Sequence, residues 1–130
     1  MPKKSKSKLE VLALMDTYEN EFIFLAGTPE EMRDYFYEKK LDEPVSIDRI
    51  NGSEWLAYNK GSVNVIMIMK DDLGVIIHEC VHAIQHAMDD VGIDTGVENT
   101  EITAYWTEWL CKHAIPFYTK YFAKLKQNAK

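Results

Sequence analysis

The chain lacks the long apolar runs and the numerous cysteines that mark two large classes of protein. None of its 130 residues belongs to a run near the roughly 18 uninterrupted apolar residues of a membrane span. The apolar part of residues 9–22 is too short, and too soon interrupted by charge, for a signal peptide. Two cysteines, Cys80 and Cys111, are too few for a disulfide framework. These absences predict a cytoplasmic protein without membrane contact.

Positive charge is also scarce, since the formal net charge is −6 at pH 7. Nucleic acid is therefore not an expected partner. The exception is residues 1–8, which carry four lysines and are expected to form a disordered basic arm. Hydrophobic residues make up 46% of the chain, enough to bury a core, so the sequence predicts a single domain over residues 1–130.

The first half of the chain predicts short strands and one well-signalled helix. The helix is expected at residues 28–40, because Thr28 suits the N-cap, Pro29 the first turn and Glu31 the third position of a capping box. Residues 9–18, before the first expected strand, show a weak helical pattern. Apolar runs bounded by turn residues predict strands at 21–27, 45–50, 54–59 and 63–69, with turns at 51–53 and 60–62.

From Asp71 onward the apolar pattern becomes helical. One helix is expected at 72–91, ending near Gly92, and a second at 96–114. Pro116 should stop or kink the second helix, and residues 117–126 should form a last amphipathic stretch. Together these elements predict an α+β domain, with a small mixed or antiparallel sheet packed against paired helices.

Three of the four histidines lie in the run VIIHECVHAIQHA, residues 75–87. His78, Glu79 and His82 form the pattern H-E-x-x-H. Helical residues four apart share one face, so both imidazoles can reach one metal ion. Glu79 is turned about 100° round the helix, where its carboxylate can take a proton from a metal-bound water. Because buried imidazoles without partners are costly, a metal explains why they occur on an apolar helix. We expect the third neighbouring histidine, His86, on the helix surface and Cys80 in the core.

A catalytic zinc site normally has three protein ligands and a water molecule. The third ligand should come from the helix that follows. Its candidates are Glu98, Glu101, Glu108 and His113. Glu98 already has a structural role available, as the partner of Thr95 in a capping box. We favour Glu101, one turn further on, because the small Ala104 on its face would let the two helices approach closely. The site is therefore expected to bind one Zn²⁺.

The run HECVH followed by ENTEITAYWTEWL resembles the gluzincin group of zincin metallopeptidases. The E-x-x-A-Y portion, from Glu101 to Tyr105, is similar to the second-helix motif of ImmA/IrrE-like peptidases. The whole pattern also resembles small peptidases encoded by phages, in which case the expected compartment is the host cytoplasm. The resemblance covers residues 63–110. It implies a minimal zincin-like domain that cleaves a protein or peptide.

The resemblance also implies roles for individual residues. His78, His82 and Glu101 would hold the zinc, and Glu79 would be the general base. Thermolysin-like enzymes have an aspartate four residues after the glutamate ligand, where this chain has Tyr105, our second candidate catalytic residue. In zincins the strand beside the motif helix is an edge that pairs with extended substrate. Residues 63–69 could be that edge or an ordinary interior strand.

Two functional classes remain open from the sequence. The first is a zinc-dependent endopeptidase, and the second is a non-catalytic zinc-binding or pseudo-peptidase module that acts through protein–protein interaction. A zinc hydrolase acting on a non-peptide amide is a minor third option. A structural zinc site needs four closed ligands and no base, whereas Glu79 supplies a base. The sequence therefore favours the enzyme, and it leaves the oligomeric state open.

Overall fold

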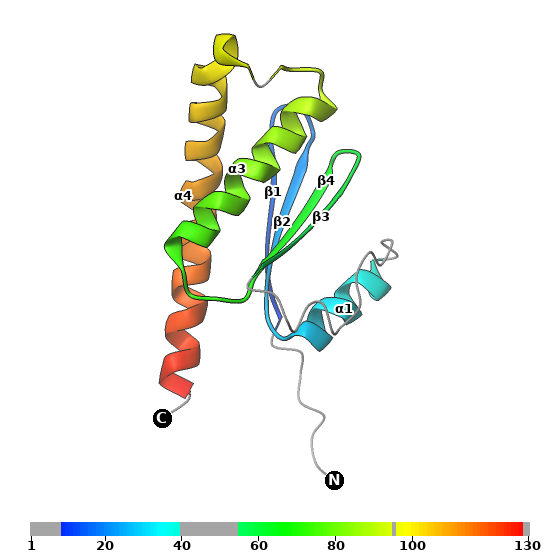
Figure 1. Ribbon diagram of the computed structural model, residues 1–130. Helices are drawn as coiled ribbons and strands as arrows, with labels where there is room; N and C mark the ends of the chain where they lie inside the picture. The colour runs from blue at the N-terminus through cyan, green and yellow to red at the C-terminus, as the bar shows by residue number, and fades with distance from the viewer. Residues whose placement is uncertain (1–8, 40–54, 95, 129–130) are drawn as a thin grey trace.

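The computed structural model describes residues 9–39, 55–94 and 96–128 (Figure 1). Its elements are β1 (Glu10–Met15), β2 (Glu21–Ala26), α1 (Pro29–Glu38), β3 (Trp55–Lys60), β4 (Val63–Ile68), α3 (Leu73–Asp90), the 3₁₀ turn η1 (Val97–Asn99) and α4 (Thr100–Asn128). The α+β class is confirmed. Within the described ranges, no helix is long and apolar enough to cross a bilayer.

Some expectations concern residues outside those ranges. They are the basic arm at 1–8, the strand at 45–50, the turn at 51–53 and the capping role of Thr95.

The four described strands form one mixed sheet in the order β1-β2-β4-β3. β2 and β4 run parallel at its centre, with Phe24 opposite Ile66, and both outer pairings are antiparallel. β4 is therefore an interior strand of the sheet. Of the two alternatives for residues 63–69, an edge strand that pairs with substrate or an ordinary interior strand, the second is correct. The outermost strand on that side of the described sheet is β3.

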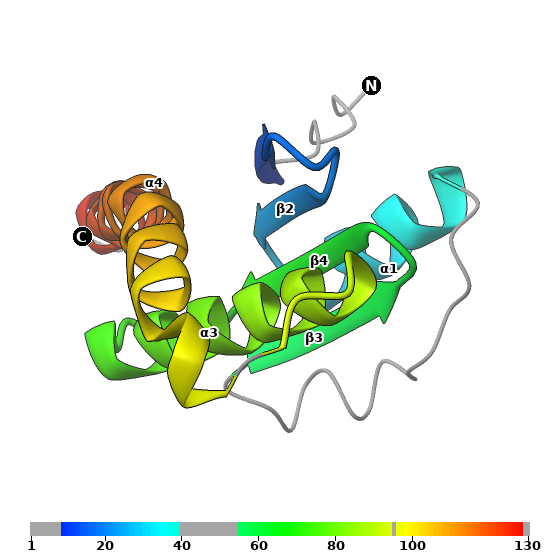
Figure 2. The ribbon, with the colours of Figure 1, turned by 90° about the horizontal axis from the view of Figure 1, so that it is seen from above.

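Both central strands are buried on both faces, as is typical of strands with nearly continuous apolar sequence. Because successive side chains point to opposite faces, the two strands divide their residues between two cores. One core contains Phe22, Phe24, Ala26, Ile66 and Ile68, with residues of α3 and α4. The other contains Ile23, Leu25, Val65 and Met67, with Met32 and Phe36 of α1. The sheet is thus covered by helices on both sides, and α3 lies over β4 and β3 (Figure 2).

The weak helical pattern at residues 9–18 gave a wrong prediction, because these residues form β1 and the turn after it. Exposure along β1 alternates strictly, with Leu12 and Leu14 half-buried against the core while Val11 and Met15 face solvent. A helix this short has little stability of its own, whereas β2 offers a complete row of backbone partners. Pairing with β2 therefore decides the conformation.

The expected capping box of α1 and the expected end of α3 near Gly92 are confirmed. At α1 the Thr28 hydroxyl accepts from the Glu31 amide at 3.2 Å, and the Glu31 carboxylate accepts from the Thr28 amide at 2.9 Å. Asp72 caps α3 by accepting from the amides of Gly74 and Val75. Gly92 follows the helix at φ +79°, a left-handed conformation that favours glycine.

The helix does not stop at Pro116, since α4 continues through it from Thr100 to Asn128 and includes the stretch expected at 117–126. Proline removes one helical hydrogen bond and crowds the preceding turn. Packing on both sides of the proline offsets this cost, because the buried stripe of α4 runs on past it. That stripe consists of Leu110, Ala114, Tyr118 and Phe122.

Tyr118 ties α4 to the centre of the sheet. Its fully buried hydroxyl lies 2.9 Å from the Leu25 carbonyl oxygen and 3.2 Å from that of Ile66, and can donate to either.

Tyr118→Phe should lower the free energy of unfolding by about 1–2 kcal/mol, because it removes a buried hydrogen bond while keeping the ring. Urea denaturation measures this. Tyr37→Phe is the matched control, since Tyr37 is 83% exposed. Equal stability of the two variants would contradict the prediction.

Candidate metal centre

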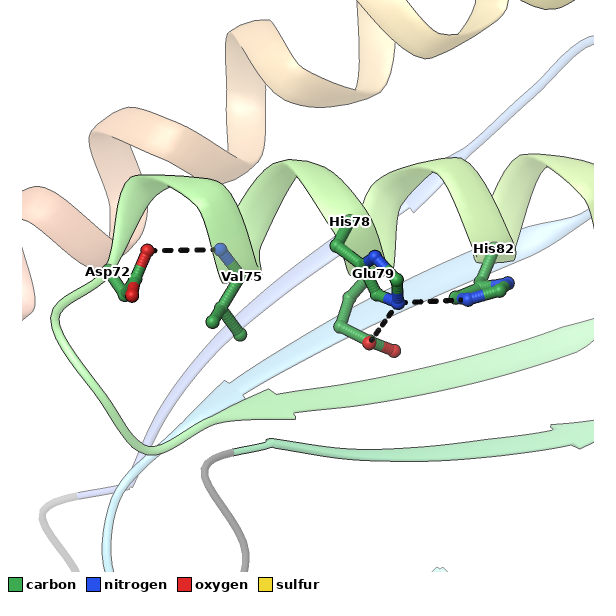
Figure 3. Close-up of polar contacts among 5 residues, drawn as sticks. All are labelled: Asp72, Val75, His78, Glu79 and His82. Carbon is green, nitrogen blue, oxygen red and sulfur yellow. Dashed lines mark hydrogen bonds and ion pairs between the residues drawn. The ribbon is translucent and has the colours of Figure 1, made fainter.

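The motif side chains lie together on the flank of α3 that faces β3 and β4 (Figure 3). The Nε2 atoms of His78 and His82 are 3.1 Å apart. Their rings meet nearly edge to face, with centroids 4.6 Å apart and planes at 78°. The four-residue spacing thus brings the two ring nitrogens together, as predicted. The expectation that both imidazoles are buried was wrong: they are exposed, because the stripe that α3 buries runs through Ile76, Cys80 and Ile84 instead.

The distance between these nitrogens is compatible with two protonation arrangements. Two neutral imidazoles can share one hydrogen bond, in which one ring donates and the other accepts. Alternatively, both nitrogens can be unprotonated and direct their lone pairs at one cation. Two ligands of a tetrahedral zinc, each at about 2.0–2.1 Å, stand about 3.3 Å apart. The observed separation of 3.1 Å is close to this value.

Glu79 points from α3 toward the strands and is only 1% exposed (Figure 3). Its Oε2 lies 3.9 Å from His78 Nε2 and has no hydrogen-bond partner among the described residues. Burial raises the pKa of Glu79, while positive charge on His78 or His82 acts in the opposite direction. An unpaired buried carboxylate is costly, so this oxygen is a polar group for which the described protein supplies no partner.

The described residues contain no cluster of three His, Cys, Asp or Glu side chains that could hold a metal ion. Glu101 is exposed in the first turn of α4. That helix meets α3 through Thr103, whose hydroxyl lies 3.3 Å from the Met88 sulfur. Glu101 precedes Thr103 by two positions and so projects about 200° away from this contact. His78 and His82 are therefore brought together without Glu101, whose ligand role stays a prediction.

The other candidates for the third ligand also lie elsewhere. Glu98 in η1 and Glu108 in α4 are both exposed, and His113 packs its ring against Trp109 at 5.8 Å. His86 is on the surface, as expected. None of these side chains joins the two motif histidines in a described cluster of three.

Tyr105, the second candidate catalytic residue, is 67% exposed on α4. It lines a groove of about 550 Å³ that none of the three motif side chains lines. Its catalytic role stays a prediction. Sequence reasoning missed this groove, although aromatic residues at Tyr105, Trp106 and Trp109 signal an apolar stripe at helical spacing.

Cys80 is fully buried, as expected. The sequence did not indicate that its thiol would hydrogen-bond the sulfur of Cys111 across the α3–α4 interface. This contact raises the pKa of Cys80 and lowers that of Cys111. The two cysteines thus help to hold α3 against α4 on the side of α3 remote from His78.

Comparisons of the chain with protein-family models, with curated proteins and with solved structures find no match in any of the three. The function must therefore be argued from the chemistry of the site.

Glu79→Gln should stabilise the metal-free protein at neutral pH by about 1–3 kcal/mol, because it removes a buried, incompletely paired charge. The pKa of Glu79 is raised in the folded state. The cost of ionising it is therefore absent below the unfolded pKa of about 4.3, grows as pH rises past that value, and levels off above the folded pKa.

Urea denaturation between pH 4 and pH 8, with a chelator present, measures this difference. Glu98→Gln is the control, since Glu98 is exposed. A stability gain from Glu79→Gln that is the same at every pH would contradict the electrostatic explanation.

Proposed function

We propose that the chain is a zinc-dependent metallopeptidase with a minimal zincin-like domain, acting on a protein or peptide in the cytoplasm. The observation that supports this most directly is the grouping of two converging ring nitrogens with a buried carboxylate. His78 and His82 Nε2 are 3.1 Å apart, and Glu79 Oε2 lies beside them without a hydrogen-bond partner in the described part of the chain. A purely structural site would have no use for that carboxylate.

The proposed roles follow from these positions. His78 and His82 bind the metal through Nε2, with Glu101 as the proposed third ligand. Zinc, when bound, supplies a Lewis acid that lowers the pKa of water and polarises a carbonyl group. Glu79 Oε2 accepts the proton of the attacking water and later delivers it to the leaving amine. Burial raises the pKa of Glu79, which brings it closer to the working pH and favours both transfers. We assign no step to Tyr105.

The strand β3 is the proposed docking element for an extended substrate. It is the outermost strand of the described sheet beside α3, and its backbone is paired with β4 on one side. Peptides commonly bind by adding a strand to the edge of a sheet. The Glu79 side chain points toward these strands, so a peptide there would approach the proposed base (Figure 3).

The metal itself gives the first test. Elemental analysis should find about one zinc per chain, and zinc should raise the melting temperature of the chelated protein, since binding to the native state alone stabilises it. His82→Ala should abolish both effects. A protein that takes up no zinc on titration contradicts the proposal.

The third ligand is tested by two exposed glutamates near the start of α4. Glu101→Ala should weaken zinc binding by at least tenfold, whereas Glu98→Ala should leave it unchanged. Competition with a chromophoric chelator measures both affinities. If Glu98→Ala empties the site and Glu101→Ala does not, Glu98 replaces Glu101 as the proposed ligand.

Glu79→Gln separates an enzyme from a binding module. The variant nearly keeps the shape of the side chain but cannot accept the proton, so it should retain zinc and lose peptide hydrolysis by several orders of magnitude. Hydrolysis by the unaltered chain should stop with a strong chelator and return with zinc. If Glu79→Gln keeps the biological effect in full, the chain acts instead as a zinc-binding module that recognises a protein partner.

A further inference from the structure

A second site lies on α4, in the groove lined by Tyr105. The groove separates the first half of α4 from the β1–β2 turn and has a volume of about 550 Å³. Four of the side chains that line it are aromatic: Tyr18, Tyr105, Trp106 and Trp109. No family resemblance accounts for this concentration of rings, and the proposed hydrolysis does not use it.

The sequence of α4 produces the groove through a second apolar stripe. Ile102, Tyr105, Trp106 and Trp109 follow the spacing i, i+3, i+4, i+7, which places them on one side of a helix. This side adjoins the stripe through Leu110 and Tyr118, so Trp106 and Trp109 also pack partly against the core, while Tyr105 stays exposed. The turn after β1 covers it incompletely, because Tyr18 meets the Trp106 ring at 5.7 Å yet stays 55% exposed.

The rings leave aromatic surface available to a ligand. Tyr105 is 67% exposed and Tyr18 is 55% exposed, while the Tyr18 and Trp106 planes meet at 44° and form a corner. The face of an aromatic ring carries partial negative charge, and tryptophan and tyrosine attract cations most strongly. A corner of such faces suits a positively charged group with an apolar outer surface.

Asp16 gives the groove a negative charge. It is the one charged residue among the described residues that line it. Three hydrogen bonds fix its carboxylate: Oδ1 accepts from the amides of Tyr18 at 2.8 Å and Asn20 at 2.9 Å, and Oδ2 accepts from Asn20 Nδ2 at 3.0 Å. The side chain cannot swing away, so its negative charge stays at the wall of the groove. The net charge of −6 adds attraction for cations.

We infer that this groove binds an alkylated ammonium group, held by cation–π contacts with Tyr18, Tyr105 and Trp106 and by the charge of Asp16. The methyl groups of such a cation match the apolar ring faces, and its charge matches the carboxylate. An anion would be repelled by Asp16, and a neutral apolar ligand would gain nothing from it. The cation could belong to a free small molecule such as choline or to a methylated lysine of a protein.

The decisive experiment compares choline with its neutral isostere, 3,3-dimethylbutan-1-ol, on the full chain. Tryptophan fluorescence reports binding, because Trp106 and Trp109 both line the groove. Choline should bind at least about tenfold more tightly than the isostere, the difference expected for a cation–π site of this kind. Equal affinity of the two, or no binding of choline up to 100 mM (about the limit of a useful titration), would overturn the inference.

Variants then connect the binding to the groove. Tyr18→Leu, Tyr105→Leu and Asp16→Asn should each weaken choline binding by about threefold or more. Tyr37→Leu is the matched control, since Tyr37 is 83% exposed on α1 and does not line the groove. Circular dichroism confirms that each variant is folded. Folded variants at Tyr18 and Tyr105 that bind choline as tightly as the unaltered chain would place its site elsewhere and overturn the inference.

A peptide containing trimethyllysine, compared with the same peptide containing lysine, identifies the source of the cation. A methylated peptide that binds more tightly than both the lysine peptide and choline indicates a protein ligand, whereas choline binding more tightly than the methylated peptide indicates a free small molecule. Both titrations are made in metal-free protein, so their result is independent of zinc binding and of peptide hydrolysis.

Discussion

The burial of β2 and β4 on both faces is the constraint on which the rest of the structure depends. Two apolar strands at the centre of a sheet must be covered by helices on each side, because neither face can be left to water. One face takes α1, and the other takes α3 and α4. α3 thereby packs against the sheet, and the same packing that buries Cys80 and Ile84 encloses Glu79. The site is a by-product of how the sheet is covered.

A polar group inside that packing affects both the stability of the fold and its own pKa. Glu79 weakens the fold in proportion to how well it is buried, yet burial is what gives its carboxyl a raised pKa and shields it from water. His78 and His82 avoid this conflict because their rings, on the same flank of the helix, are exposed to solvent and can exchange hydrogen-bond partners. One helix therefore combines the enclosed carboxylate that we propose as the base with two accessible imidazoles that we propose as ligands. Such a division between an enclosed group and an open one is typical of catalytic sites.

Local patterns predicted the parts of this structure that local interactions determine. The capping box at Thr28, the end of α3 near Gly92 and the doubly buried β4 all follow from short stretches of sequence. β1 was misread because its few residues fit a helix or a strand, and only β2 decides between them. Pro116 does not stop α4, because its local penalty is outweighed by packing several residues away. The third ligand and the groove depend on how α4 is rotated against its neighbours, which no spacing within one segment specifies.

The parallel pairing of β2 with β4 has a consequence for how the chain folds. It joins residues about forty positions apart, such as Phe24 and Ile66, whereas the contacts between α3 and α4 close a much shorter loop. Long loops cost more entropy to close and delay the contacts that depend on them. The paired helices should therefore form first and carry His78 and His82 already within reach of each other. The strands then assemble beneath them, so the enclosure of the carboxylate is among the last events of folding.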